Sequence, residues 1–291
     1  MNLNNFLKKT PYFKPIFSDG IHSEMIRAEL LENKPSMIAR FGSSEIVGTL
    51  YPSMPSSIKL LIRDNLFKKL RNNAGFFSVS PDSINEFSNL MINDMKLLDI
   101  LVSSRYEEKF LVKNFPEAPR IEFTALEPYY SKNPWSEVLE GLKVLVVHPF
   151  NTTIERQYHQ NRALIFKDQR VLPQFKSLET VKAVQSIAGS KSEFNNWFDA
   201  LDSMKAAIDA KDYDVAIIGC GAYGFPLAAH VKRSGKKAIH LGGATQILFG
   251  IKGKRWDEHP IISSFYNDHW VRPAPEDVPI DANKVENGCY W

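Results

Sequence analysis

Residues 215–256 read VAIIGCGAYGFPLAAHVKRSGKKAIHLGGATQILFGIKGKRW, and this stretch decides the fold. An apolar run leads into Gly219, Gly221 and Gly224, which fit the pattern G-x-G-x-x-G, and a helical pattern follows. A second apolar run and a second helical pattern repeat the order. Alternating strands and helices predict an α/β protein whose mostly parallel sheet carries helices on both faces.

The same alternation extends through most of the chain. Apolar patterning and turn signals predict helices over residues 21–33, 55–73, 81–105, 151–166, 191–211, 225–235 and 244–251. They predict strands over residues 35–42, 76–80, 110–115, 120–128, 143–150, 214–221 and 237–243. We expect a single Rossmann-like domain over residues 1–291, made of two intimate halves that divide near residue 140. The tail, residues 259–291, is expected to wrap over the body.

Composition excludes several classes of protein. Of the 291 residues, 44% are apolar and 24% are charged, as in ordinary globular proteins. A net charge of +3 is too small for a general nucleic-acid binder. The two cysteines, Cys220 and Cys289, make no disulfide framework and favour a reduced, cytoplasmic setting. No apolar run reaches the ~18 residues of a membrane span.

The N-terminal segment leaves two interpretations open. Residues 1–17 have no long apolar stretch or cleavage site of a signal peptide. They mix Lys8, Lys9 and Lys14 with aromatic residues. The segment is either a surface arm or a peripheral contact with an anionic membrane surface.

The glycine loop also has more than one interpretation. Its glycines favour either a phosphate beside the backbone or close packing of helix against strand. A site for NAD needs an acidic residue at the end of the next strand, which here carries His240, Gly242 and Gly243 instead. The nicotinamide interpretation therefore lacks its second anchor.

Other residues near this loop suit a sugar nucleotide. Lys252, Lys254 and Arg255 follow the second glycine turn and are candidates to neutralise a diphosphate. Tyr223 and Trp256 are candidates to stack on a base or sugar.

Several segments carry a family resemblance. Residues 37–51, MIARFGSSEIVGTLY, resemble the Arg-Phe-Gly-Asp-Gly-Glu segment of glycosyltransferases with the GT-D fold, once catalogued as domains of unknown function. The stretches 134–150 and 225–256 and the ending VENGCYW resemble uncharacterised proteins of bacterial surface-polysaccharide clusters. The resemblance implies a GT-D-like fold and transfer of sugar from a nucleotide-sugar donor to a glycan or lipid-linked acceptor. Such a role in capsule or O-antigen assembly places the protein in the cytoplasm, at the inner membrane face.

The resemblance assigns roles residue by residue. Arg40 and Gly42 match the family segment, Glu45 matches the second acid of its Asp-x-Glu pair, and Ser43 replaces the first acid. The pair implies substrate binding, catalysis and a Mn²⁺ or Mg²⁺ ion at Glu45. With Ser43 the site loses one ligand, so the basic cluster at 252–255 becomes the alternative source of positive charge. Glu45 is otherwise only an acid at a helix N-terminus.

Weaker candidates complete the predictions. His148 ends a predicted strand and is a candidate base. Glu127 and Asp268 lie among aromatic residues, as acids of sugar-binding sites do. The alternatives to a glycosyltransferase are a Rossmann-like nucleotide-binding or oxidoreductase-type protein and a non-catalytic component of polysaccharide assembly.

Overall fold

The structure is a computed structural model that describes residues 20–186, 192–279, 282–284 and 288–291. The N-terminal arm predicted over residues 1–17 lies outside the described residues. Within them, no helix is both long enough and apolar enough to cross a bilayer.

One seven-stranded sheet forms the centre of the molecule, in the order β3-β2-β1-β7-β6-β4-β5. Every pair of neighbouring strands is parallel. The predicted α/β class with a parallel sheet is therefore confirmed. The strands are β1 (Ser36–Arg40), β2 (Ile100–Ser103), β3 (Arg120–Glu122), β4 (Lys143–His148), β5 (Ser177–Lys182), β6 (Val215–Ile218) and β7 (Lys237–His240).

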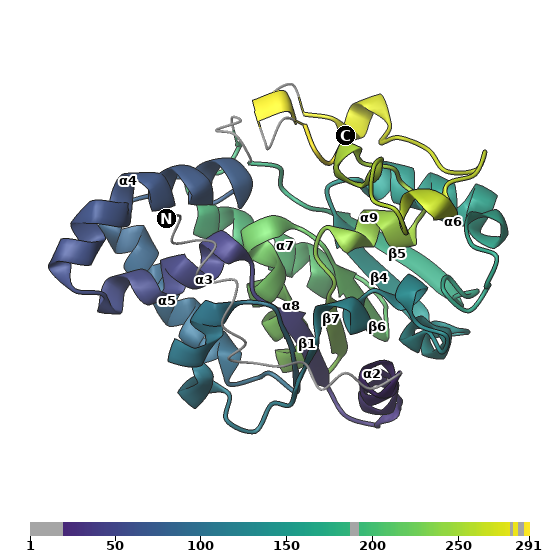
Figure 1. Cartoon of the computed structure of the whole chain (residues 1–291), viewed down its shortest axis with the longest axis horizontal. Helices are drawn as coiled ribbons and strands as arrows, with labels where there is room; N and C mark the ends of the chain where they lie inside the picture. The colour runs from purple at the N-terminus through teal and green to yellow at the C-terminus, as the bar shows by residue number, and fades with distance from the viewer. Residues whose placement is uncertain (1–19, 187–191, 280–281, 285–287) are drawn as a thin grey trace.

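Helices cover both faces of this sheet (Figure 1). Strand residues alternate between two apolar layers, so Leu145 and Val147 face one layer while Val144 and Val146 face the other. Packed in the first layer are α3 (Ser43–Leu50), α4 (Ser56–Asn73), α5 (Pro81–Met95), α7 (Trp197–Asp209) and α8 (Gly224–Arg233). Packed in the second are α2 (Ile21–Leu31), α6 (Asn151–Ile165) and α9 (Ala244–Leu248).

The described part of the C-terminal tail is tied to α6 and α9. Asp277 is fully buried, and its Oδ2 accepts hydrogen bonds from the backbone N–H and the hydroxyl of Thr153, at 2.9 and 2.6 Å. Val271 pairs with the segment after α9, since Lys252 N–H donates to the Val271 carbonyl at 2.7 Å. These contacts hold the tail beside the carboxyl ends of the strands.

Several predicted elements were wrong, each for a local reason. The helix predicted over 81–105 ends at Met95, a turn follows, and residues 100–103 form the buried strand β2. Periodicity alone does not separate so short an apolar run from a helix. Residues 76–80 form no strand, and residues 110–115 lie in 3₁₀ turns.

Two elements were not predicted at all. The edge strand β5, with the sequence SLETVK, is only partly buried, so it lacks the apolar character of a central strand. Helix α3 begins after Gly42 with two serines and a glutamate, so its short apolar stripe gives no clear helical pattern in the sequence.

Candidate functional site

A cavity of about 530 Å³ lies where the strands end. Its walls come from the loops after β1, β3, β4, β6 and β7, and parallel sheets bind ligands at this carboxyl edge. Most of the predicted site residues line it: Arg40, Gly42, Ser43, Glu45, His148, Gly219, Gly221, Tyr223, His240, Gly242, Gly243, Arg255 and Trp256. Gly224, Lys252 and Lys254 are not among its lining residues.

Gly219 brings β6 against the neighbouring turn. A Cβ at this position would lie 2.5 Å from both the Gly242 carbonyl oxygen and Thr245 Oγ1, and 2.9 Å from the ring of His148. Real Cβ atoms do not approach other atoms so closely. The two glycine turns therefore touch each other here, and a side chain would force them apart.

The other two glycines of the pattern also make internal contacts. Gly221 has φ +58°, and its Cβ would lie 2.7 Å from the carbonyl oxygen of Ala74, at the end of α4. A Cβ on Gly224 would lie 2.2 Å from Nε2 of His240. All three glycines thus permit close packing of chain against chain, which is the second of the two interpretations drawn from the sequence.

The two histidines are neutral and have opposite tautomers. His148 Nδ1 accepts the Phe150 backbone N–H at 3.0 Å, so the proton of the neutral ring is on Nε2. His240 Nδ1 lies 3.1 Å from the Arg40 carbonyl oxygen, which only accepts, so here Nδ1 carries the proton. Burial lowers the pKa of His148 to about 3. Burial, aided by the charge of Arg40, lowers the pKa of His240 to about 3.

These tautomers bear on the predicted base. His148 offers the cavity an Nε2–H donor, and its other nitrogen is occupied by the backbone. Acting as a base would require that ring to give up the hydrogen bond to Phe150. In this arrangement His148 is better suited to donate a hydrogen bond to an anion.

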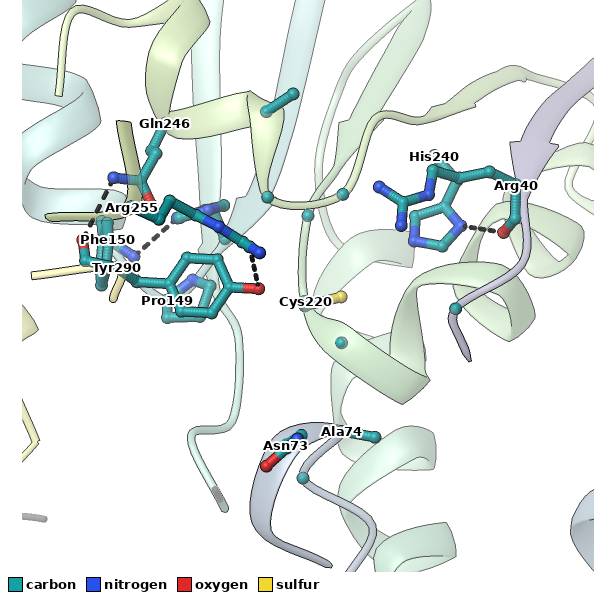
Figure 2. A pocket seen from close by; sticks show the side chains of 18 of the residues that line it. Arg40, Asn73, Ala74, Pro149, Phe150, Cys220, His240, Gln246, Arg255 and Tyr290 are labelled. Carbon is teal, nitrogen blue, oxygen red and sulfur yellow. Dashed lines mark hydrogen bonds between the residues drawn. The ribbon is translucent and has the colours of Figure 1, made fainter. Parts of the chain in front are cut away.

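Arg40 places a half-buried cation at the end of β1. Its guanidinium lies over the ring of Phe123, 4.8 Å from the centroid, and beside His240 (Figure 2). Burial lowers its pKa, but a guanidinium remains charged at neutral pH. Its Nε is buried and has no hydrogen-bond partner among the described residues. A buried donor without a partner is costly unless a ligand or water satisfies it.

Arg255 lies across the cavity from Arg40 (Figure 2). Its Nη1 donates to the hydroxyl of Tyr290 at 2.9 Å, and its guanidinium lies 5.3 Å from the ring centroid of Trp256. The tail itself is fixed because the Gln246 side chain donates to the Tyr290 carbonyl at 3.2 Å. Two guanidinium groups therefore approach one cavity from opposite ends of the sequence.

Of the remaining candidates, Lys252 and Lys254 do not line the cavity, whereas Tyr223 and Trp256 do. Lys252 Nζ lies 5.2 Å from the ring centroid of Tyr266, and Lys254 is exposed outside the cavity. Tyr223 stacks on Trp197 at 4.8 Å, so one ring face is already covered. Of the predicted stacking residues, Trp256 is the one that keeps more of its ring available, since it is only half-buried.

Glu45 turns back over the start of α3. Backbone groups of Ser44 and of Glu45 itself favour the charged form of its carboxylate and lower its pKa. A Cβ on Gly42 would lie 2.2 Å from its Oε1, so this fold of the side chain requires glycine at 42. Burial raises the pKa of Glu45, against the opposing effects of these backbone groups and of Arg40. The geometry is that of an acid at a helix N-terminus, within the cavity wall.

Glu127 is a second carboxylate in the cavity wall. It is buried, and its Oε2 accepts the hydroxyl of Tyr129 at 2.8 Å. Burial raises its pKa, and the hydrogen bond from Tyr129 opposes that shift only in part. A carboxylate with a raised pKa beside a cavity is suited to accept a proton near neutral pH.

The residues present do not assemble a divalent-cation site. Among the described residues no three His, Cys, Asp or Glu side chains gather closely enough to hold a metal. The backbone at the start of α3 and the positive charge of Arg40 already stabilise the charge of Glu45. The predicted Mn²⁺ or Mg²⁺ ion is untested and stays a prediction, but this donor set does not favour it.

Sequence reasoning missed cavity residues that are distant in the chain. Asn73 and Ala74 come from the end of α4, Phe123 follows β3, and Tyr290 and Trp291 come from the tail. The resemblance of the ending VENGCYW was the available signal for the tail. Asp268, named among the weaker candidates, does not line the cavity.

Comparisons with known proteins give a likeness of fold. The sequence matches no model of a known protein family, and no curated protein matches it. One similar solved structure is a selenomethionine form of domain of unknown function 1792, with 14% identity over 78% of this chain and 83% of that one and a TM-score of 0.41. Another is described as a new glycosyltransferase (DUF1792) from Streptococcus sanguinis, with 14% identity over 76% and 80% and a TM-score of 0.37.

Proposed function

We propose that this protein is a glycosyltransferase that moves a sugar from a nucleoside-diphosphate donor to a hydroxyl of a glycan or lipid-linked acceptor. The observation that carries the proposal is the pair of guanidinium groups, Arg40 and Arg255, on two sides of one cavity. Guanidinium groups bind phosphate oxygens through pairs of parallel hydrogen bonds. Arg40 also has an Nε donor to satisfy. A place in surface-polysaccharide assembly follows from the sequence resemblance.

The cavity residues suit the charges of such a transfer. The acceptor oxygen bonds to the anomeric carbon while the bond from that carbon to the diphosphate oxygen breaks. Arg40, Arg255 and the His148 Nε2–H would stabilise the negative charge on the departing diphosphate. Glu127 would take the hydroxyl proton, because its raised pKa makes it a stronger base than an ordinary carboxylate.

A nicotinamide enzyme is the alternative that the glycine pattern suggests. Its ribose hydroxyls would need a carboxylate at the end of β7, where the chain has His240 followed by Leu241 and Gly242. The acids that line the cavity are Glu45, which lies at the start of α3, and Glu127, which comes from the loop after β3. A non-catalytic role in polysaccharide assembly remains the second alternative.

Thermal unfolding with candidate ligands tests the proposal. UDP or GDP at a hundredfold excess over its dissociation constant should stabilise the fold by roughly 2.7 kcal/mol, whereas NADH should not. Arg255→Gln should remove most of the shift, because it removes one of the two guanidinium groups. Lys254→Gln is the matched control, since Lys254 is the exposed neighbour outside the cavity. A shift with NADH alone would favour the oxidoreductase, and no shift with any nucleotide would favour the non-catalytic role.

A further inference from the structure

Helix α4 carries a concentration of exposed apolar side chains at its start. Ile58, Leu60 and Leu61 are 44%, 73% and 84% exposed. Eight large apolar side chains among the described residues are at least 44% exposed, and three of them lie within the four positions 58–61. Further along α4, Leu66 and Leu70 are buried and hold the helix on the body. Single exposed leucines are ordinary, but a cluster on one helix end indicates a binding surface.

The same helix carries the positive charge of the protein. Helix α4 has five basic residues and one acidic residue, Asp64, so its net charge is +4. The whole chain has a net charge of +3, so the remainder is slightly negative. The basic side chains are Lys59, Arg63, Lys68, Lys69 and Arg71, of which all but Lys59 belong to exposed residues.

We propose that α4 docks this protein onto an anionic lipid surface, with Leu60 and Leu61 entering the headgroup region. Helices that lie on membranes combine exposed apolar side chains with Lys and Arg residues, and the exposed surface of α4 has both kinds of side chain. Each basic residue near an anionic bilayer adds about 1 kcal/mol of attraction. A symmetric dimer through α4 would instead bring two helices of net charge +4 together, which like-charge repulsion opposes.

The far end of α4 relates this surface to the cavity. Asn73 and Ala74, its last residue and C-cap, line the cavity, and a helix rises 1.5 Å per residue. Leu61 is therefore about 18 Å along the helix axis from the cavity wall. If the proposed function holds, docking by α4 would keep the cavity within reach of an acceptor anchored in lipid, which favours the lipid-linked acceptor over a free glycan.

Co-sedimentation of the full chain with vesicles tests the docking surface. We expect binding to vesicles of phosphatidylglycerol and phosphatidylcholine, and little binding to phosphatidylcholine alone. Leu60→Ser/Leu61→Ser should lower the partition ratio by roughly tenfold or more, because two apolar side chains no longer enter the lipid. Lys68→Gln/Lys69→Gln should lower it by roughly tenfold at low salt, since two attractive charges are lost.

The matched control uses two exposed leucines on the other side of the sheet. Leu31 and Leu164 are 68% and 50% exposed, on α2 and α6, so Leu31→Ser/Leu164→Ser should bind as the wild type does. The proposal is overturned if the Leu60/Leu61 variant binds like the wild type, if the control loses as much, or if the wild type ignores anionic vesicles. A dimer that the Leu60/Leu61 variant dissociates would also overturn it. Because the vesicles contain no sugar nucleotide, the result is independent of the ligand-induced thermal shift.

Discussion

Replacing Gly221 by alanine tests whether close packing or ligand binding requires a glycine in this loop. Gly221 has φ +58°, where an L side chain is strained by roughly 1–2 kcal/mol. Its new Cβ would also lie 2.7 Å from the Ala74 carbonyl oxygen. That oxygen is held in place by the Ala222 N–H at 3.0 Å, so relief requires movement of backbone. Overpacking of this kind adds about 1–3 kcal/mol.

The expected loss of stability is therefore about 2–5 kcal/mol. In a chain of this length 1 kcal/mol corresponds to roughly 1.5–2 °C, so the melting temperature should fall by about 4–9 °C. The control is Gly235→Ala, because Gly235 has φ +80° but would place its Cβ in open space. The melting temperature of Gly235→Ala should fall by only about 2–4 °C, because this variant adds backbone strain alone.

The measurement is calorimetry on both variants without ligand, followed by the thermal shift with UDP or GDP. The difference between the two variants isolates the contact with Ala74. Equal melting temperatures for both variants, together with loss of the nucleotide shift in Gly221→Ala only, would refute the packing argument. The glycine would then be present to admit a phosphate.

The remaining predictions concern the titratable groups of the cavity and the metal. Glu127→Gln should lower turnover by a factor of order 10² to 10³ with nucleotide binding retained. Glu45→Gln should keep the fold because glutamine has nearly the same size and shape, and the same loss of turnover would assign Glu45 the catalytic role predicted from the sequence. Assays with EDTA and with Mn²⁺ should agree for the wild type; strict metal dependence would contradict charge stabilisation by the arginines. Burial lowers the pKa of His148 to about 3 in the folded state. Between about pH 6 and 4 the imidazole is therefore protonated in the unfolded chain but not in the folded one. The free energy of unfolding consequently falls as the pH falls. His148→Asn should make chemical unfolding less pH-dependent by about 1.4 kcal/mol per pH unit, and an unchanged slope would show that His148 titrates normally.

The parts of the fold that could be predicted are those with strong local signals. Strands β4, β6 and β7 are buried on both faces and read as continuous apolar runs between turn signals. Strand β2 has the same apolar character, but it follows α5 after only four residues and was absorbed into the predicted helix. Edge strand β5 has exposed positions along its length, so its sequence carries no comparable pattern.

The part of the site that could be predicted is the part that the topology of the sheet determines. Residues that follow parallel strands meet at one edge of the sheet, which is why Arg40, His148 and His240 share a cavity with the glycine turns. Sequence does not give the direction in which a loop side chain points, so Arg255 was grouped with Lys252 and Lys254 although only Arg255 lines the cavity. The contribution of the tail depends on contacts between residues far apart in the chain, which no local pattern encodes.

The glycine pattern and the cavity charges together indicate how this site would hold a phosphate. In a dinucleotide fold the glycines let the pyrophosphate approach the backbone. Here the chain fills the side of Gly219 and Gly221 on which a Cβ would stand, while both glycines also line the cavity, so the turns shape the wall and the charge comes from side chains. Arg40 is fixed by burial and by Phe123, whereas Arg255 is anchored on the tail through Tyr290. Closure around a diphosphate would therefore depend on where the tail sits, and the tail position depends in turn on its contacts with α6 and α9.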